Sequence, residues 1–158
     1  MIIRDAYANE TAALVELLRA ASLVWDDQRE WVLANPDLIN GNARDLDAQI
    51  PAGGVRVAEE GDELLGFSAI VRSADGEADL DGLFVSPARM RTGIGAALVA
   101  DVVERLRRDG VRRLTVLANL NALGFYERVG FTAIELRPTD FKEAMLMEIL
   151  IPSPSSPA

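Results

Sequence analysis

The stretch with the clearest chemical potential is the basic loop at residues 86–92 and the two glycines that follow it. An apolar run ends at Val85, Pro87 prevents the strand from continuing, and residues 93–95 read Gly-Ile-Gly at the start of a helical pattern. The first N–H groups of a helix have no partner inside it, and the helix dipole makes that end positive. Glycines let a ligand approach closely, and Arg89 and Arg91 add formal charge. This combination predicts a seat for a phosphate or pyrophosphate.

Two common nucleotide motifs are excluded. No Gly-Lys-Ser or Gly-Lys-Thr occurs, so the loop is not a P-loop. The Rossmann fingerprint needs a glycine directly after the strand, but seven residues separate Val85 from Gly93, and Leu98 occupies the third glycine position. Taken alone, Gly-x-Gly also suits a tight turn before a surface helix, so both interpretations stay open at this point.

A second stretch, residues 114–131, has the pattern of a strand followed by a short helix. It contains a spaced set of residues: Asn119, Ala122, Phe125, Tyr126, Glu127, Gly130 and Phe131. Together with the loop, this set resembles the GNAT superfamily, the acyl-CoA-dependent N-acetyltransferases, whose second signature reads Asn-x-x-Ala-x-x-aromatic-Tyr-Glu-x-x-Gly-Phe. The family loop reads Gln/Arg-x-x-Gly-x-Gly/Ala, and residues 90–95 match it except that Met90 stands where Gln or Arg is usual.

The resemblance implies a mixed α/β (α+β) sheet of the GNAT fold, in which an antiparallel meander adjoins a parallel strand pair that splays apart. It implies acetyl-CoA as co-substrate. The implied cofactor-binding residues are Leu83, Phe84, Val85, Arg91, Thr92, Gly93, Ile94, Gly95, Ala96, Asn119 and Tyr126. In this scheme the backbone of residues 83–85 meets the pantetheine arm, and Asn119 contacts that arm, caps a helix, or does both.

Acyl transfer from a thioester needs a neutral amine and a proton for the departing thiolate. Tyr126 is the candidate acid, or a hydrogen-bond donor to the sulfur, because an ordinary tyrosine pKa near ~10 keeps it protonated at pH 7. A core tyrosine is the alternative. Asp79 and Asp81 are the candidate bases, since they share one face of the predicted strand, and Asp79 lies where some family members carry a glutamate base. Solvated aspartates with a chain of waters as the base remain the alternative.

The charge balance and the missing residue types exclude several classes of function. The net charge is −9, and residues 1–88 hold 17 acidic and 6 basic residues against 8 and 10 in the remainder. This balance argues against nucleic acid and favours a cationic acceptor. The chain has no Cys and no His, which excludes thiolate metal sites, His-dependent triads and a covalent acyl-cysteine, so no metal is expected. No long apolar run or signal-peptide layout is present, and a cytoplasmic protein is expected.

The expected elements follow from periodicity and turn residues. Strands are predicted at residues 1–5, 55–59, 64–71, 77–85, 112–118, 131–136 and 144–149, with helices at residues 93–109 and 119–128. Asn9 is predicted to cap a first helix that runs to Ala21. A second helix carries Trp31 and stops at Pro36, and both Trp25 and Trp31 are assigned to the core. Residues 36–54 are predicted to be a substrate-side loop with one helical turn at residues 45–49.

The sequence therefore predicts one GNAT domain over residues 1–151 and a disordered tail at residues 152–158. The expected activity is transfer of the acetyl group of acetyl-CoA to a primary amine of a small molecule or peptide, by direct attack in a ternary complex. A non-catalytic acyl-CoA sensor is the alternative, and a larger acyl donor or a hydroxyl acceptor is a third reading. Family members often form dimers, which makes a homodimer through the apolar C-terminal strand an expectation by analogy.

Overall fold

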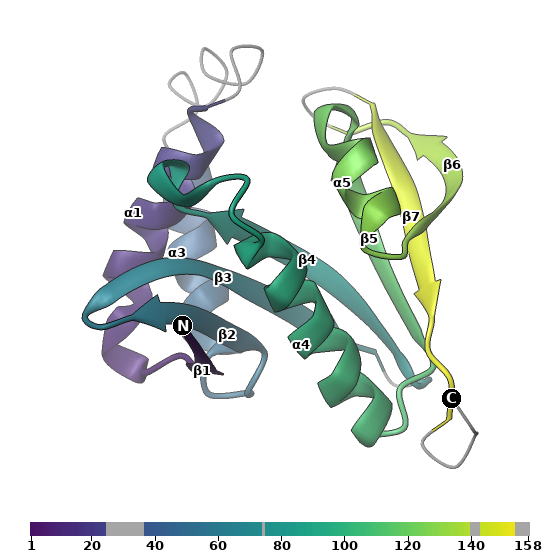
Figure 1. Cartoon of the computed structure of the whole chain (residues 1–158), viewed down its shortest axis with the longest axis horizontal. Helices are drawn as coiled ribbons and strands as arrows, with labels where there is room; N and C mark the ends of the chain where they lie inside the picture. The colour runs from purple at the N-terminus through teal and green to yellow at the C-terminus, as the bar shows by residue number, and fades with distance from the viewer. Residues whose placement is uncertain (25–36, 74, 140–142, 154–158) are drawn as a thin grey trace. The chain divides into compact units, whose positions relative to one another are not determined.

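The computed structural model describes residues 1–24, 37–73, 75–139 and 143–153. Seven strands form one mixed sheet in the order β1-β2-β3-β4-β5-β7-β6, which confirms the predicted fold class (Figure 1). Contacts group the chain into two compact units. The first unit comprises Met1–Ala69 and Gly82–Leu98, and the second comprises Ile70–Asp81 and Val99–Ala158. Each unit is described in turn.

An antiparallel sheet forms the framework of the first unit. Its strands are β1 (Ile2–Asp5), β2 (Val55–Glu60) and the first part of β3 (Glu63–Arg72), with β1 at the sheet edge. Gly61, at φ 60°, makes the tight turn between β2 and β3. The neighbouring residues Val57 and Ala58 belong to different buried clusters, so the two faces of β2 are both covered.

Two helices cover one of these faces. The helices α1 (Thr11–Ser22) and α3 (Asp37–Gln49) pack side by side, as Figure 1 shows, and Leu14, Leu18 and Leu46 join the core cluster. The prediction of a loop with a single turn at residues 45–49 was wrong, because α3 is a helix of 13 residues. Its Asn-Gly-Asn run at residues 40–42 has the composition of a loop, but burial of Leu46 outweighs that local preference.

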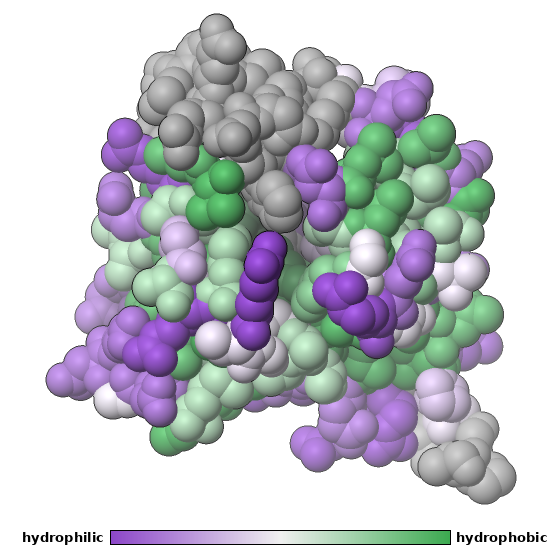
Figure 2. Space-filling model, turned by 45° about the horizontal axis from the view of Figure 1, so that its top comes forward, coloured by the Kyte–Doolittle hydropathy of each residue, from purple (hydrophilic) through white to green (hydrophobic). Residues whose placement is uncertain are grey.

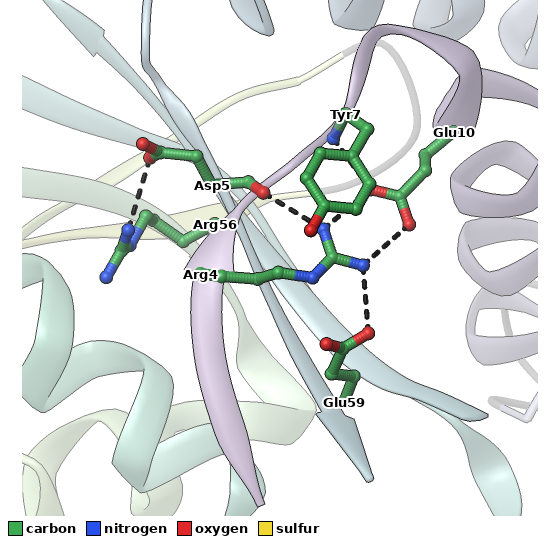
Figure 3. A network of polar contacts seen from close by, with 6 residues as sticks. All are labelled: Arg4, Asp5, Tyr7, Glu10, Arg56 and Glu59. Carbon is green, nitrogen blue, oxygen red and sulfur yellow. Dashed lines mark hydrogen bonds and ion pairs between the residues drawn. The ribbon is translucent and has the colours of Figure 1, made fainter. Parts of the chain in front are cut away.

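The helix start near Asn9 also differs from the prediction. Asn9 lies inside a 3₁₀ turn, Ala8–Glu10, and does not cap α1. The Glu10 carboxylate instead accepts the Tyr7 N–H at 2.7 Å and two bonds from Arg4 at 2.9 Å (Figure 3). Arg4 also binds Glu59 at 2.9 Å and lies 3.9 Å from the Tyr7 ring centroid. This network, rather than a local cap, ties the start of α1 to β1 and β2.

The second unit contains the parallel strand pair. The register pairs Glu77 to Asp79 of β4 (Glu77–Val85) with Arg113 to Thr115 of β5 (Arg113–Asn119). The ladder ends there although both strands continue, which is the hydrogen-bonding pattern of a splayed pair. β7 (Ala144–Leu150) inserts between β5 and β6 (Thr132–Arg137), antiparallel to both, and β6 forms the edge.

Helix α4 (Ile94–Arg108) contributes its first turn to the first unit and the remainder to the second. One face of the helix is apolar, and its residues Ile94, Leu98, Val102 and Leu106 are all buried. In the first unit, Ile94 and Leu98 pack with Ala58 and Leu65. Gly110, at φ 78°, follows the end of the helix, where a positive φ favours glycine.

Some predictions concern residues outside this description. The helix expected to carry Trp31, the core assignment of Trp25 and Trp31, and most of the tail, residues 154–158, lie outside the described residues. Within the described part of the chain, no helix has both the length and the apolar character needed to cross a membrane.

Candidate active site

The N-terminus of α4 carries a run of free backbone donors. Ala97 donates the first helical hydrogen bond, to the carbonyl oxygen of Gly93 at 3.0 Å. Among the described residues, the N–H groups of Ile94, Gly95 and Ala96 have no hydrogen-bond partner. These donors and the helix dipole make this end of α4 electropositive, as an anion seat requires.

The loop before α4 adopts an unusual backbone conformation. Arg91, at φ 64°, is the one non-glycine residue with positive φ in the described part of the chain, and Gly93 follows at φ 86°. No atom lies within 4 Å of the position that a Cβ at Gly93 would take. Glycine is therefore favoured here by backbone conformation and not by lack of space. Arg91 and Thr92 are exposed beside it.

Arg89 does not contribute its charge to this seat in the way that the sequence suggested. Its guanidinium binds Glu63 at 2.8 Å and lies 3.8 Å from Glu60, at the turn between β2 and β3. The Thr92 hydroxyl donates to the Arg89 carbonyl oxygen. Arg89 therefore anchors the loop through carboxylates that are distant in sequence, which leaves Arg91 as the exposed cation of the loop.

The end of β4 is held against β3 in the first unit. The rings of Phe84 and Phe67 lie 5.3 Å apart between centroids. A Cβ placed on Gly66 would lie 2.7 Å from the Phe84 carbonyl oxygen and 3.3 Å from the Val85 Cα. Gly66, which sequence reasoning did not single out, thus permits the close approach of β3 to the backbone of Phe84 and Val85.

Asn119 ends β5 and caps the turn that follows. Its side-chain oxygen accepts the Asn121 N–H at 2.9 Å, at the start of the 3₁₀ turn Leu120–Ala122. The helix-cap interpretation is confirmed, whereas a contact with the cofactor arm stays a prediction.

Tyr126 lies on the short helix α5 (Leu123–Arg128) between two aromatic rings. Its ring makes edge contacts with Phe125 at 5.1 Å and with Phe131 at 5.4 Å between centroids. The residue as a whole is half-buried, but burial around its hydroxyl raises the pKa of Tyr126 to about 12. The phenol therefore keeps its proton throughout the neutral and mildly alkaline range.

Asp79 occupies the last rung of the β4–β5 ladder. The Thr115 hydroxyl donates to Asp79 Oδ1 at 2.9 Å. Burial raises the pKa of the half-buried Asp79 carboxyl, the Thr115 hydrogen bond opposes that rise, and the charge of Asp81 adds to it. Asp81 itself is exposed, so Asp79 is the better placed of the two candidate bases.

The predicted site residues thus fall into two groups. Residues 83–85 and 91–96 lie in the first unit, whereas Asp79, Asp81, Asn119 and Tyr126 lie in the second. Asp79 and Tyr126 share no hydrogen-bond or ring partner among the described residues. In the same part of the chain, no three His, Cys, Asp or Glu side chains are grouped so as to hold a metal ion.

The structure thus combines a mixed sheet, a short parallel ladder and, between the two paired strands in the sequence, a helix whose first N–H groups are free. The sequence model of the acetyltransferase (GNAT) family matches residues 13–131, and the chain belongs to that family. No curated protein sequence gives a significant match.

Solved structures agree with this fold. PaiA N-acetyltransferase from Thermoplasma acidophilum, in complex with coenzyme A, superposes with a TM-score of 0.78 at 19% identity, covering 94% of this chain and 98% of that one. An aminoglycoside 6′-N-acetyltransferase complexed with coenzyme A gives 0.77 at 20% identity, with 98% and 100% covered. YncA from Salmonella typhimurium, solved with acetyl-CoA, gives 0.73 at 21% identity, with 100% and 98% covered.

Proposed function

We propose that this acyltransferase moves the acetyl group of acetyl-CoA to a primary amine of a small molecule or peptide, by direct attack in a ternary complex. The observation that carries the proposal is the run of unpartnered N–H groups at the start of α4. Such a run suits the pyrophosphate of a CoA thioester. Coenzyme A or acetyl-CoA in the three related structures supports the same cofactor.

The first unit supplies the proposed cofactor contacts. The N–H groups of residues 93–96 bind the pyrophosphate, with Arg91 and Thr92 beside them. The backbone of Leu83, Phe84 and Val85 is proposed to bind the pantetheine arm, and Asn119 is proposed as a further contact to that arm. Because most of these contacts are made by backbone groups, Met90 in place of the usual Gln or Arg removes at most one polar side chain.

Asp79 and Tyr126 are the proposed acid–base groups. Asp79 accepts a proton from the acceptor ammonium or from the attacking amine, directly or through water. The amine nitrogen then forms a bond to the thioester carbonyl carbon, and the carbon–sulfur bond breaks. Tyr126 donates its proton to the departing thiolate, or hydrogen-bonds the sulfur while water provides the proton. A raised carboxyl pKa suits the base, and a protonated phenol suits the acid.

The acceptor is proposed to be cationic. Residues 1–88 hold 17 acidic and 6 basic residues, so a protonated amine would be attracted towards this part of the chain. By its name, one of the related proteins acetylates an aminoglycoside, which is a polyamine. A polyamine, an amine-bearing antibiotic or a peptide amine each meets this requirement.

A thermal-shift titration tests the cofactor first. Acetyl-CoA, CoA and longer acyl-CoAs are compared, and a ligand that binds only the folded state adds about 2.7 kcal/mol at one hundred times its dissociation constant. A shift with acetyl-CoA is expected, and absence of a shift with any CoA compound would overturn the proposal. A panel of amines with thiol detection then tests turnover. Binding without turnover of any amine or alcohol would favour a sensor.

A homodimer is the proposed assembly. All six residues of the edge strand β6 are exposed, and Leu136 retains 52% of its surface and Leu150 of β7 retains 70%. Figure 2 shows hydrophobic residues at the surface on the right of the view, the side on which Figure 1 places α5, β6 and β7. Light scattering is expected to give a dimer for the native chain and a monomer for Leu136→Glu. A native monomer at micromolar concentration would refute the proposal.

A further inference from the structure

The hydrogen bond from Thr115 engages only one of the two carboxylate oxygens of Asp79. The Thr115 Oγ1 lies 2.9 Å from Asp79 Oδ1 and 3.5 Å from the Ala78 carbonyl oxygen. One hydroxyl has one proton, and the closer, charged acceptor makes the stronger bond. Asp79 Oδ2 has no hydrogen-bond partner among the described residues, so one carboxylate oxygen is held while the other stays available.

Two arginines on the strands that flank β4 are paired with carboxylates. Arg113, the β5 residue two positions before Thr115, binds Glu148 of β7 at 2.5 Å and Glu77 of β4 at 3.4 Å. On the neighbouring strand β3, Arg72 binds Asp109 at 2.8 Å. Glu148 is the β7 register partner of Thr115, and Asp81 adds a negative charge on the strand of Asp79.

Thr115 is thus the one side chain that donates a hydrogen bond to Asp79 in the described part of the chain. The register supports this geometry, because Asp79 and Thr115 face each other on the last rung of the parallel ladder. Beyond that rung, β5 no longer pairs with β4, so the position of the Asp79 side chain depends on this bond more than it would inside a continuous ladder.

We propose that Thr115 is a positioning residue for the general base: it holds Asp79 Oδ1 so that Oδ2 is directed to the proton of the acceptor amine. This inference rests on the proposed function, since it assigns a partner to the proposed base. Thr115 does not touch the reacting atoms, and it acts only through Asp79.

The proposal has a definite consequence for the pH profile. The Thr115 hydrogen bond stabilises the ionised carboxylate and so lowers the pKa of Asp79, against the burial that raises it. Removal of the hydroxyl leaves burial and the charge of Asp81 unopposed, and the pKa of Asp79 rises. A base works only when it is deprotonated, so the acid limb of kcat/KM must move to higher pH.

The experiment compares pH profiles of kcat/KM at saturating acetyl-CoA for the native chain, Thr115→Val, Thr115→Ala and Thr115→Ser. The valine and alanine variants are expected to lose roughly tenfold on the acid side, the value of one hydrogen bond to a charged group, with little change on the alkaline plateau. The serine variant restores the hydroxyl and is expected to restore the native limb. A purely structural role would lower the rate at every pH.

Thr132→Val is the matched control. Thr132 of β6 is the register partner of Glu148 on the side away from Thr115, and it is exposed. This control is expected to keep the native profile, and the acetyl-CoA thermal shift is expected to stay unchanged in all the variants.

The Asp79→Asn variant distinguishes failure of the inference about Thr115 from failure of the proposed base. If Asp79→Asn abolishes the acid limb but Thr115→Val and Thr115→Ala leave it in place, the role of Thr115 is refuted while the proposed base stands. If the limb persists in Asp79→Asn, the proposed base is wrong, and the inference about Thr115 falls with it.

Discussion

Gly66 provides the sharpest test of how the first unit fixes the end of β4. In a strand, replacing glycine with alanine ordinarily stabilises a protein by about 0.5–1 kcal/mol, because glycine loses more backbone entropy on folding. At Gly66 the new Cβ would stand 2.7 Å from the Phe84 carbonyl oxygen, and 3.3 Å from both the Val85 Cα and the Leu98 Cδ1. A backbone atom cannot rotate away, so β4 or β3 must shift.

Overpacking of this kind costs about 1–3 kcal/mol, which exceeds the entropic gain. The net expectation for Gly66→Ala is a loss of about 0.5–2 kcal/mol in the free energy of unfolding. For a chain of this size, each kcal/mol corresponds to about 2–4 °C in Tm. Because the displaced backbone belongs to the proposed pantetheine contacts, the thermal shift with acetyl-CoA should also shrink.

The assay is urea denaturation together with the acetyl-CoA titration. Gly124→Ala is the matched control for stability, since its Cβ would meet only the flexible end of the Arg128 side chain, at 3.3 Å. That variant, on helix α5, is expected to be equal to the native chain or more stable. A Gly66→Ala chain as stable as the native one would refute the claim that close approach at Gly66 fixes β4.

Three further predictions concern the site itself. Gly93→Ala introduces no steric clash, but it places alanine at φ 86°, which costs about 1–2 kcal/mol. Calorimetry should therefore show a lower free energy of unfolding, and the thermal shift with acetyl-CoA should be smaller. Tyr126→Phe should lower kcat by about 10²-fold at every pH up to 11, because the pKa of Tyr126 is raised to about 12; unchanged turnover would exclude the acid role. For Asp79 the folded pKa is raised, so the native chain loses stability as pH rises through that pKa. Asp79→Asn should therefore unfold at the same or a higher temperature than the native chain at pH 8, and a clearly lower Tm there would contradict the burial argument.

The regular elements of the fold were predictable because their sequences agree with their surroundings. The apolar spacing of α4 and the turn at Gly61 each encode a local structure that packing then preserves. Helix α3 was not predictable in the same way. Its residues 40–42 favour a loop, and only the burial of Leu46 in the core of the first unit shows why the helix forms.

The positions of the sequence motifs in the candidate site were predictable, but the side-chain contacts around them were not. The start of α4 and the position of Tyr126 follow from matched spacing in the sequence. Arg89 pairs with Glu63, which lies 26 positions away in the sequence. Thr115 pairs with Asp79, which lies 36 positions away. No local pattern encodes such pairs, because they depend on strand register. The close approach of β4 to the buried Gly66 could not be predicted from the sequence for the same reason.

The absence of histidine determines how the proposed base has to be built. A carboxylate with its ordinary pKa near ~4 is ionised at neutral pH but holds a proton too weakly to be an efficient base. Burial raises the pKa of Asp79, which makes the carboxylate a stronger base. The same burial lowers the free energy of unfolding when the carboxylate is ionised. The Thr115 hydrogen bond opposes that rise in the pKa of Asp79 and holds one oxygen of its carboxylate. In the proposed mechanism, a chain with no histidine obtains its base from one half-buried aspartate and one neighbouring hydroxyl, which strand register places side by side.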